Sequence, residues 1–97
     1  MKQRILRVAS LGEVNTYILP VIVSPTRIKD LVVTGALEAR HCTISEQGYM
    51  EKYLRRQLSR HNGVKFWEVG DEIRDPFLDL VATIEETEVV SHEITKN

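Results

Sequence analysis

The chain has 97 residues, 42% of them hydrophobic and 28% charged, with a net charge of −1. These shares are typical of a globular protein and argue against a wholly disordered chain, and the length suits a single domain over residues 1–97. Cys42 is the only cysteine, which excludes an intrachain disulfide, and the longest apolar run is too short to cross a membrane. We therefore expect a cytoplasmic protein without membrane contact.

The N-terminal quarter of the chain predicts two strands. The first covers residues 4–9 and is followed by a turn sequence, Ser-Leu-Gly. The second covers residues 16–23 and is rich in β-branched and aromatic side chains. Pro20 lies inside it and has no backbone N–H to donate, so we expect this strand at a sheet edge or at a bulge.

The next twenty residues carry conflicting signals. Ser24 followed by Pro25 is typical of a helix start, and apolar or small residues then recur at helical spacing. The Leu-Val-Val-Thr run favours a strand instead, and Gly35 disfavours a continuing helix. The prediction is a short helix over residues 25–33, a stop at Gly35 and a strand over residues 37–44.

A long amphipathic helix over residues 45–61 is the clearest element of the pattern. Ser45 can cap its start, and Asn62-Gly63 supplies the left-handed residue that ends a helix. One face is apolar and the opposite face is basic, as expected for a helix packed on a core. The apolar face carries Met50, Tyr53, Leu54 and Leu58.

The C-terminal third predicts two further strands. Residues 64–69 (VKFWEV) alternate in polarity, and Gly70-Asp71 marks a turn. Residues 77–84 alternate too, with a helix starting at Pro76 as the alternative, and residues 87–94 are either an edge strand or loose. The elements together predict an α+β fold: a mostly antiparallel sheet of about five strands with one long helix and one short helix.

Charge is distributed unevenly along the chain. Residues 1–65 hold eleven basic and five acidic residues, a net of +6, whereas residues 66–97 hold two and nine, a net of −7. Folding either interleaves the two halves or leaves a basic and an acidic pole. A basic pole suits phosphates, and an acidic pole suits a basic partner surface.

The predicted helix carries candidate nucleic-acid ligands on its polar face. These are Lys52, Arg55, Arg56 and Arg60, with Tyr49 beside them as a residue that can stack on a base. The alternative is structural, because basic residues late in a helix also favour the negative end of its dipole.

Phe66 and Trp67 indicate an interface. Neighbouring residues of a strand point to opposite faces, so one helix-covered face cannot bury both. Either the short helix covers the second face or another chain does. The second reading predicts a homodimer or a protein partner, with Trp67 as an anchor.

The reactive side chains match no known catalytic or metal motif. His41 and Cys42 are adjacent, and on a strand they would point to opposite faces and could not form a catalytic pair. Cys42 is expected to be a core residue, and His61 to be structural or solvent-facing. No zinc spacing and no phosphate loop occur in the sequence. Four acidic residues lie close together, but their spacing does not fit a calcium loop: Asp71, Glu72, Asp75 and Asp79. We therefore expect no metal and no cofactor.

One arrangement is shared with an enzyme family. His41 precedes the helix 45–61, which leads into a strand pair around Gly70-Asp71. This order resembles the layout of the small viral ring nucleases, which cut cyclic oligoadenylates. The resemblance lies in the order of elements, and the family's N-terminal motif is missing. It implies a small cyclic-nucleotide phosphodiesterase in which His41 acts as acid or base.

The leading prediction is a non-enzymatic protein-interaction module, a homodimer that acts as an inhibitor or adaptor of nucleic-acid machinery. The first alternative is a nucleic-acid-binding protein that uses the basic helix, and the second is the phosphodiesterase with His41. The first alternative predicts affinity that falls steeply with salt.

Overall fold

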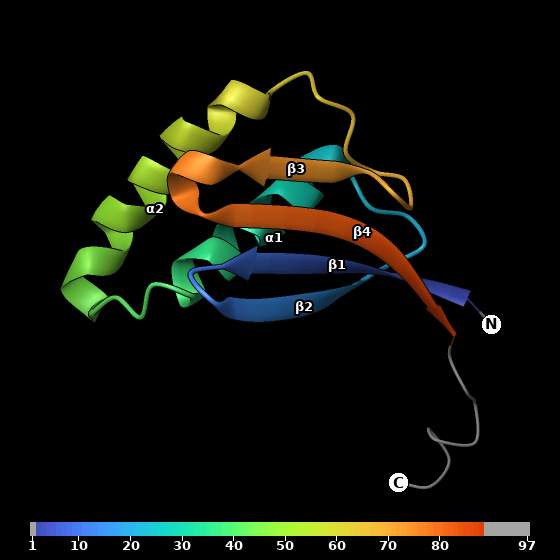
Figure 1. The fold of residues 1–97 in the computed structure, drawn as a ribbon, viewed down its shortest axis with the longest axis horizontal. Coiled ribbons are helices and arrows are strands. Elements are labelled where there is room, and N and C mark those ends of the chain that lie inside the picture. Colours follow the sequence, from blue (N-terminus) through green and yellow to red (C-terminus); the bar gives the residue numbers. More distant parts are fainter. Residues whose placement is uncertain (1, 89–97) are drawn as a thin grey trace, which may run out of the picture.

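The computed structural model describes residues 2–88, and this part of the chain has an α+β architecture of four strands and two helices (Figure 1). The predicted fold class is confirmed, although about five strands were expected. In chain order the elements are β1 (Lys2–Ser10), β2 (Glu13–Leu19), α1 (Pro25–Glu38), α2 (Ile44–Leu58), β3 (Glu72–Asp75) and β4 (Leu80–Glu88), with 3-10 turns at Ser59–His61 and Pro76–Leu78.

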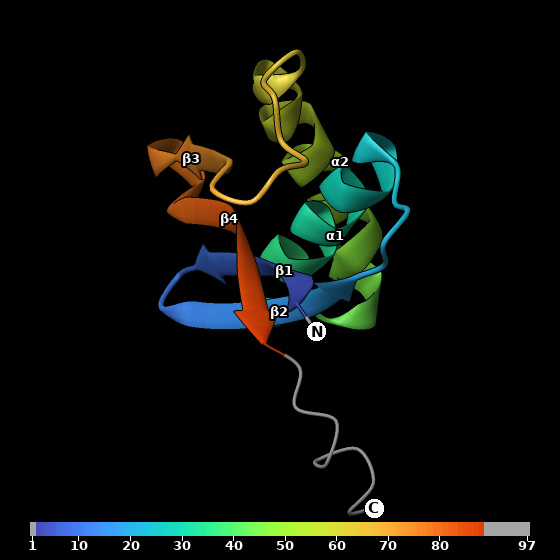
Figure 2. The same cartoon turned by 90° about the vertical axis from the view of Figure 1, so that its right-hand side faces the viewer.

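The four strands form one antiparallel sheet in the order β2-β1-β4-β3. β1 and β4 are the central strands and pair along nine residues, from Lys2 opposite Glu88 to Ser10 opposite Leu80. β2 is an edge strand, as predicted, but it covers Glu13–Leu19 instead of residues 16–23 and ends before Pro20. Both helices lie on the same face of the sheet, and no described element covers the other face (Figure 2).

The core lies between the helices and the sheet. Alternate residues of β1 and β4 point toward the helices, as expected for strands with one covered face. Burying each large apolar side chain contributes about 1.5–3 kcal/mol. The side chains with the least exposure come from all layers: Leu6, Val8, Ile28, Val32, Ala36, Leu54, Phe66, Leu80, Ala82 and Ile84.

Helix α1 is longer than predicted, and this corrects both the helix over residues 25–33 and the strand over residues 37–44. Its start agrees with the sequence, because the Ser24 hydroxyl accepts the Arg27 N–H at 3.1 Å. It continues through Gly35, where an added Cβ would lie 2.8 Å from the Cβ of Val8. The residue that was expected to stop the helix is therefore the one that lets it pack against β1.

Helix α2 agrees closely with the predicted helix over residues 45–61. It begins at Ile44 and continues into the 3-10 turn at Ser59–His61. Thr43 caps it in place of Ser45, since Thr43 and Glu46 form a reciprocal capping box.

The segment after α2 differs most from the prediction. Residues 64–69 form no strand, and β3 follows at residues that were not predicted as a strand. β4 begins at Leu80, three residues later than expected, because the Asp75 carboxylate accepts the N–H groups of Phe77 and Leu78 and caps a 3-10 turn. β4 ends at Glu88, so most of the tail prediction lies outside the described residues.

Folding interleaves the two oppositely charged halves of the chain. β1 comes from the basic half and pairs with β4 from the acidic half. Arg7 forms an ion pair with Glu85 at 2.9 Å, and Lys2 forms one with Glu86 at 3.5 Å. The charge asymmetry of the sequence is therefore cancelled across the sheet.

Candidate functional site

The predicted basic face of α2 is present and exposed. Lys52, Arg56 and Arg60 follow one another at intervals of four residues, so they line one side of the helix and its terminal turn. Tyr49 is 78% exposed at the start of this side. Tyr49, Lys52, Tyr53 and Arg56 together line a small hollow of about 90 Å³. Tyr53 was assigned to the apolar face from sequence, and the structure places part of it beside the cations.

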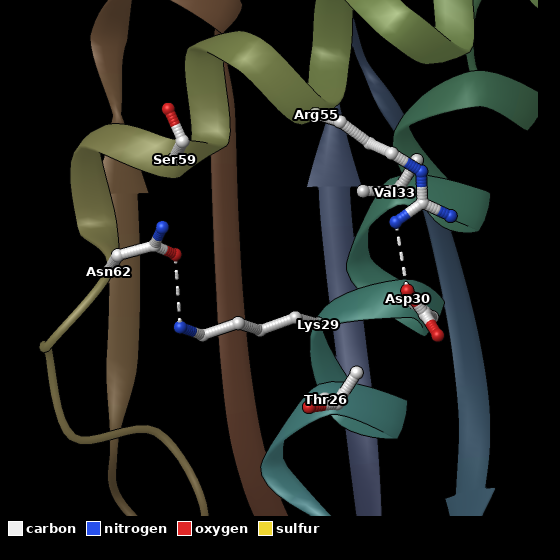
Figure 3. Close-up of a pocket in the computed structure, with 7 residues that line it drawn as sticks. All are labelled: Thr26, Lys29, Asp30, Val33, Arg55, Ser59 and Asn62. Atoms are coloured by element: carbon white, nitrogen blue, oxygen red, sulfur yellow. Dashed lines mark hydrogen bonds and ion pairs between the residues drawn. The ribbon is translucent and has the colours of Figure 1, made fainter.

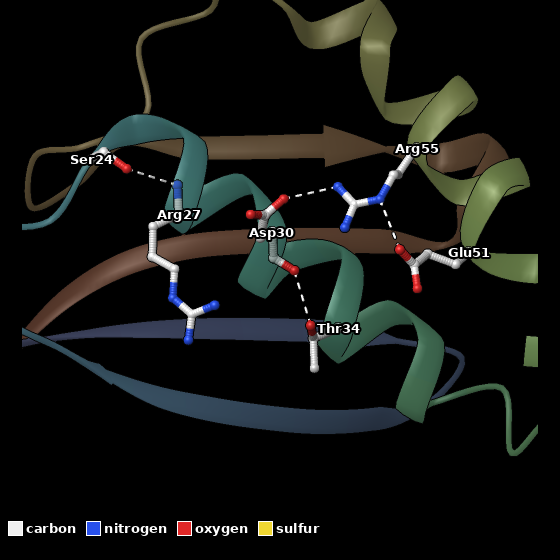
Figure 4. Close-up of polar contacts among 6 residues, drawn as sticks. All are labelled: Ser24, Arg27, Asp30, Thr34, Glu51 and Arg55. Atoms are coloured by element: carbon white, nitrogen blue, oxygen red, sulfur yellow. Dashed lines mark hydrogen bonds and ion pairs between the residues drawn. The ribbon is translucent and has the colours of Figure 1, made fainter. Parts of the chain in front are cut away.

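Arg55 does not belong to this exposed face. Its Nη1 donates to Asp30 of α1 at 2.8 Å, and its Nε donates to Glu51 at 3.0 Å (Figure 4). Both carboxylates raise the pKa of Arg55, chiefly through the hydrogen bond that Arg55 donates to Asp30. Because two anions surround it, its charge is used to join the helices and is not offered to a ligand.

The other three cations remain available. Within residues 2–88, Lys52, Arg56 and Arg60 form no ion pair with a carboxylate. Arg60 instead lies over the ring of Phe77, 5.8 Å from its centroid. Three positive charges without a carboxylate partner in the described part of the chain therefore follow one line along the helix.

Phe77 closes this line with a second aromatic ring. It is 68% exposed on the Pro76–Leu78 turn, and with Arg60 and Arg74 it borders a shallow hollow of about 210 Å³. Sequence reasoning missed Phe77 because it was placed on a strand. We call six side chains the α2 strip: Tyr49, Lys52, Tyr53, Arg56, Arg60 and Phe77.

A hydrogen bond between His61 and the buried Asp75 holds the far end of the α2 strip. His61 Nε2 lies 3.1 Å from Asp75 Oδ2, and Asp75 is almost fully buried. The same carboxylate accepts two backbone N–H groups of the turn that carries Phe77. The His61–Asp75 hydrogen bond thus joins the turn that carries Phe77 to the 3-10 turn that carries Arg60.

A groove between the two helices has fewer charged groups free to bind a ligand than the α2 strip has. It has a volume of about 310 Å³ (Figure 3). Its charges are already engaged, because Arg55 binds Asp30 and Lys29 Nζ donates to the side-chain oxygen of Asn62 at 3.3 Å. These contacts tie α1 to α2 and to the turn that follows it.

His41 occupies a different and more acidic hollow. It follows α1 in the left-handed region, with φ 52°, and its ring Nε2 contacts the Glu13 carboxylate. The hollow measures about 520 Å³, and its lining includes Glu13, Glu38 and Cys42 but no lysine or arginine. Two carboxylates without a lysine or arginine beside them disfavour an anionic cyclic nucleotide. The role of His41 as acid or base stays a prediction.

Phe66 and Trp67, the predicted interface residues, lie in the irregular segment before β3. Phe66 is 1% exposed and belongs to the core, whereas Trp67 is 43% exposed. Because the two residues do not lie on a strand, their exposure does not indicate an uncovered second face of the sheet. The Asp71 carboxylate accepts the N–H groups of Glu68 and Trp67, and these bonds lower the pKa of Asp71.

Trp67 lies at one end of the sheet beside the loop that follows β2. Arg4 joins these two segments, because its guanidinium donates to the carbonyl oxygens of Trp67 at 2.6 Å and Val21 at 3.3 Å. Val21 and Ile22 are 94% and 90% exposed. We call Val21, Ile22 and Trp67 the apolar end patch.

Comparison of the chain with protein-family models, with curated proteins and with solved structures found no match. Across residues 2–88, no helix combines the length and apolar character needed to cross a membrane. In the same residues, no group of three or more histidine, cysteine, aspartate or glutamate side chains is placed to hold a metal ion.

Proposed function

We propose that the chain binds single-stranded nucleic acid along the α2 strip. One observation carries this proposal: Lys52, Arg56 and Arg60 have no carboxylate partner within residues 2–88, and exposed aromatic rings lie at both ends of their line. Unpaired cations contact phosphates, and exposed rings stack on bases that a duplex would keep hidden.

The dimensions of the α2 strip suit a short stretch of strand. Eleven residues separate Tyr49 from Arg60, which at 1.5 Å per residue is about 17 Å. A stacked strand carries one phosphate per 3.4 Å, so the strip follows about five phosphates. The three cations contact a subset of these, and Tyr49 and Phe77 receive bases at the two ends.

Fluorescence anisotropy with labelled ten-nucleotide poly(dT) and poly(U) tests this proposal. Three phosphate contacts predict a slope of log affinity against log salt of about −2, which makes binding about 20-fold weaker at 200 mM than at 50 mM salt. A duplex of the same length should bind more weakly, because its bases are not free to stack.

Two variants and one matched control make the test specific. Arg56→Glu should abolish binding, whereas Tyr49→Ala should weaken it about 5- to 150-fold without changing the salt slope. Arg27→Glu changes the net charge equally, and Arg27 points away from the Asp30–Arg55 pair (Figure 4). Equal losses for Arg27→Glu and Arg56→Glu would reduce the effect to general electrostatics and contradict the proposal.

A second candidate function is the protein-interaction module, in which the apolar end patch binds a component of nucleic-acid machinery. The observation that favours it is the exposure of Val21 and Ile22 beside Trp67 at one end of the molecule. Aromatic and aliphatic side chains in this setting are typical anchors of protein interfaces.

Site-specific cross-linking separates this candidate from nucleic-acid binding. A photoreactive group at position 22 should capture one cellular protein, with Trp67→Ser removing the product and Arg56→Glu leaving it unchanged. Capture that survives Trp67→Ser would argue against the patch.

A further inference from the structure

The free edge of β2 lacks the features that usually prevent strand pairing. Between Glu13 and Leu19 there is no lysine, arginine or proline, and the strand contains no bulge in its pairing with β1. On the uncovered face it exposes Val14, Thr16 and Ile18, with Val14 53% and Ile18 66% exposed. β2 is the first strand in the sheet order β2-β1-β4-β3, and Figure 1 shows it at the border of the sheet opposite β3.

The opposite edge of the sheet is protected. β3 has only four residues, and two of them, Glu72 and Arg74, are exposed charged residues that form an ion pair with each other. Short length and charge are the common means of preventing edge-to-edge association. β3 has both, whereas β2 has seven residues and its one charged residue, Glu13, is at its first position. The β2 edge is therefore the one suited to a partner.

We propose that β2 pairs antiparallel with β2 of a second copy of this chain, about a two-fold axis through Thr16, to form a continuous sheet of eight strands across the dimer. Thr16 is the middle residue of the seven-residue strand, so this register uses its full length. It places Val14 opposite the partner's Ile18, and Ile18 opposite the partner's Val14.

The side chains of β2 are self-complementary in this register. Within one protomer Ile18 already pairs with Ile5 of β1, and Val14 pairs with Ala9. The two-fold contact therefore extends two apolar rows across the uncovered face of both copies. Cross-strand pairs of β-branched residues stabilise a sheet, and the backbone groups of the edge gain hydrogen-bond partners.

The charges on the uncovered face do not oppose the contact. Arg7 is paired with Glu85, and Arg74 with Glu72, so these charges cancel within each protomer. The dimer is therefore expected to depend little on salt, unlike nucleic-acid binding by the α2 strip. A seven-residue strand is about 24 Å long, which is short for a stable interface, so association should depend on protein concentration.

Disulfide cross-linking tests the register directly. In a Cys42→Ser background, Thr16→Cys places two thiols across the two-fold axis, where opposed Cα atoms of an antiparallel pair lie within about 5.5 Å and meet disulfide geometry. Val14→Cys is the matched control, because two copies of residue 14 would lie about 14 Å apart in this register. We expect rapid disulfide formation for Thr16→Cys and not for Val14→Cys. Equal rates of disulfide formation in both variants would overturn the proposal.

Light scattering after gel filtration gives a second, independent test. The wild-type chain should show a concentration-dependent dimer at both 50 and 500 mM salt, and Ile18→Lys should be a monomer, because it places a charge on the edge. Ile18 is exposed, so at concentrations where the wild type is monomeric the circular dichroism spectrum and thermal unfolding of this variant should match the wild type. A wild-type monomer at millimolar concentration, or an Ile18→Lys dimer, would contradict the pairing.

Discussion

Leu54, Arg55 and Arg56 are consecutive residues of α2, yet they meet three different environments. Leu54 is fully buried in the core, Arg55 lies between two carboxylates, and Arg56 is exposed with no carboxylate partner in residues 2–88. The inner sides of the helix therefore hold the fold together, and its outer side is free for a ligand. A positive charge counts toward binding only where folding has left it unpaired.

The inner side should give the largest effect on stability. Leu54→Ala removes a fully buried side chain and leaves a cavity, so we expect a loss of about 2–5 kcal/mol in the free energy of unfolding. Urea denaturation followed by circular dichroism measures this. Leu11→Ala is the exposed control, with an expected change within about 0.5 kcal/mol. A loss below 1 kcal/mol for Leu54→Ala would contradict the packing of α2 on the core.

The contact between α1 and β1 should give the next largest effect. Gly35→Ala forces a methyl group to within 2.8 Å of Val8, and we expect a net destabilisation of about 1–3 kcal/mol. Gly48→Ala in α2 is a matched control, because a Cβ there meets nothing within 4 Å. It should stabilise the protein by up to about 1 kcal/mol through helix propensity. Stabilisation by both variants would show that α1 does not approach β1 this closely.

These contacts also explain which parts of the fold the sequence predicted. The helix over residues 45–61 was predictable because its apolar periodicity and its end signal agree, although its cap is Thr43 and not Ser45. Gly35 misled the prediction of α1, since close approach to Val8 is a tertiary property that no local pattern shows. The segment 64–69 alternates like a strand, but the Asp71 carboxylate binds its backbone N–H groups and takes the place of strand pairing.

The candidate site was predictable to the extent that helical spacing determines it. Lys52, Arg56 and Arg60 follow from that spacing alone. The pairing of Arg55 with Asp30, 25 residues away, and the position of Phe77 beside Arg60 depend on how α1 and the 3-10 turn pack against α2. Such long-range contacts decide which cations are free, and one sequence does not contain them.

The Arg55 bridge should contribute modestly to stability. Arg55→Ala removes both ion pairs, but all three side chains are at least a third exposed, so we expect a loss of up to about 1 kcal/mol that shrinks at high salt. A double-mutant cycle that combines Arg55→Ala with Asp30→Ala measures the coupling free energy between these two side chains. Strictly additive losses would mean that the bridge seen in Figure 4 has no energetic coupling.

The pH dependence of the Trp67 segment should be smaller again. The N–H groups of Glu68 and Trp67 stabilise the Asp71 carboxylate and hold its pKa below the ordinary value of 3.8. A lowered folded-state pKa stabilises the protein above the unfolded value, and this contribution is lost as the pH falls through the folded value. The urea midpoint of wild type should therefore exceed that of Asp71→Asn at pH 7, and the gap should narrow below pH 3.8. Asp79→Asn, with the exposed Asp79 outside this segment, should show no such gap.

The smallest expected effect on stability tests the outer side of α2. Arg56→Ala removes an exposed charge that has no carboxylate partner in the described chain, so the free energy of unfolding should change by less than about 0.5 kcal/mol. The same substitution should weaken oligonucleotide binding and make its salt slope shallower by about 0.7. Paired urea denaturation and anisotropy measurements on Arg55→Ala and Arg56→Ala compare the two neighbours directly. Because Arg55 is ion-paired and Arg56 is not, Arg55→Ala should lower the free energy of unfolding, and Arg56→Ala should lower the affinity for the oligonucleotide. If Arg56→Ala lowers stability as much as Arg55→Ala does, Arg56 belongs to the fold and its charge is not free for a ligand.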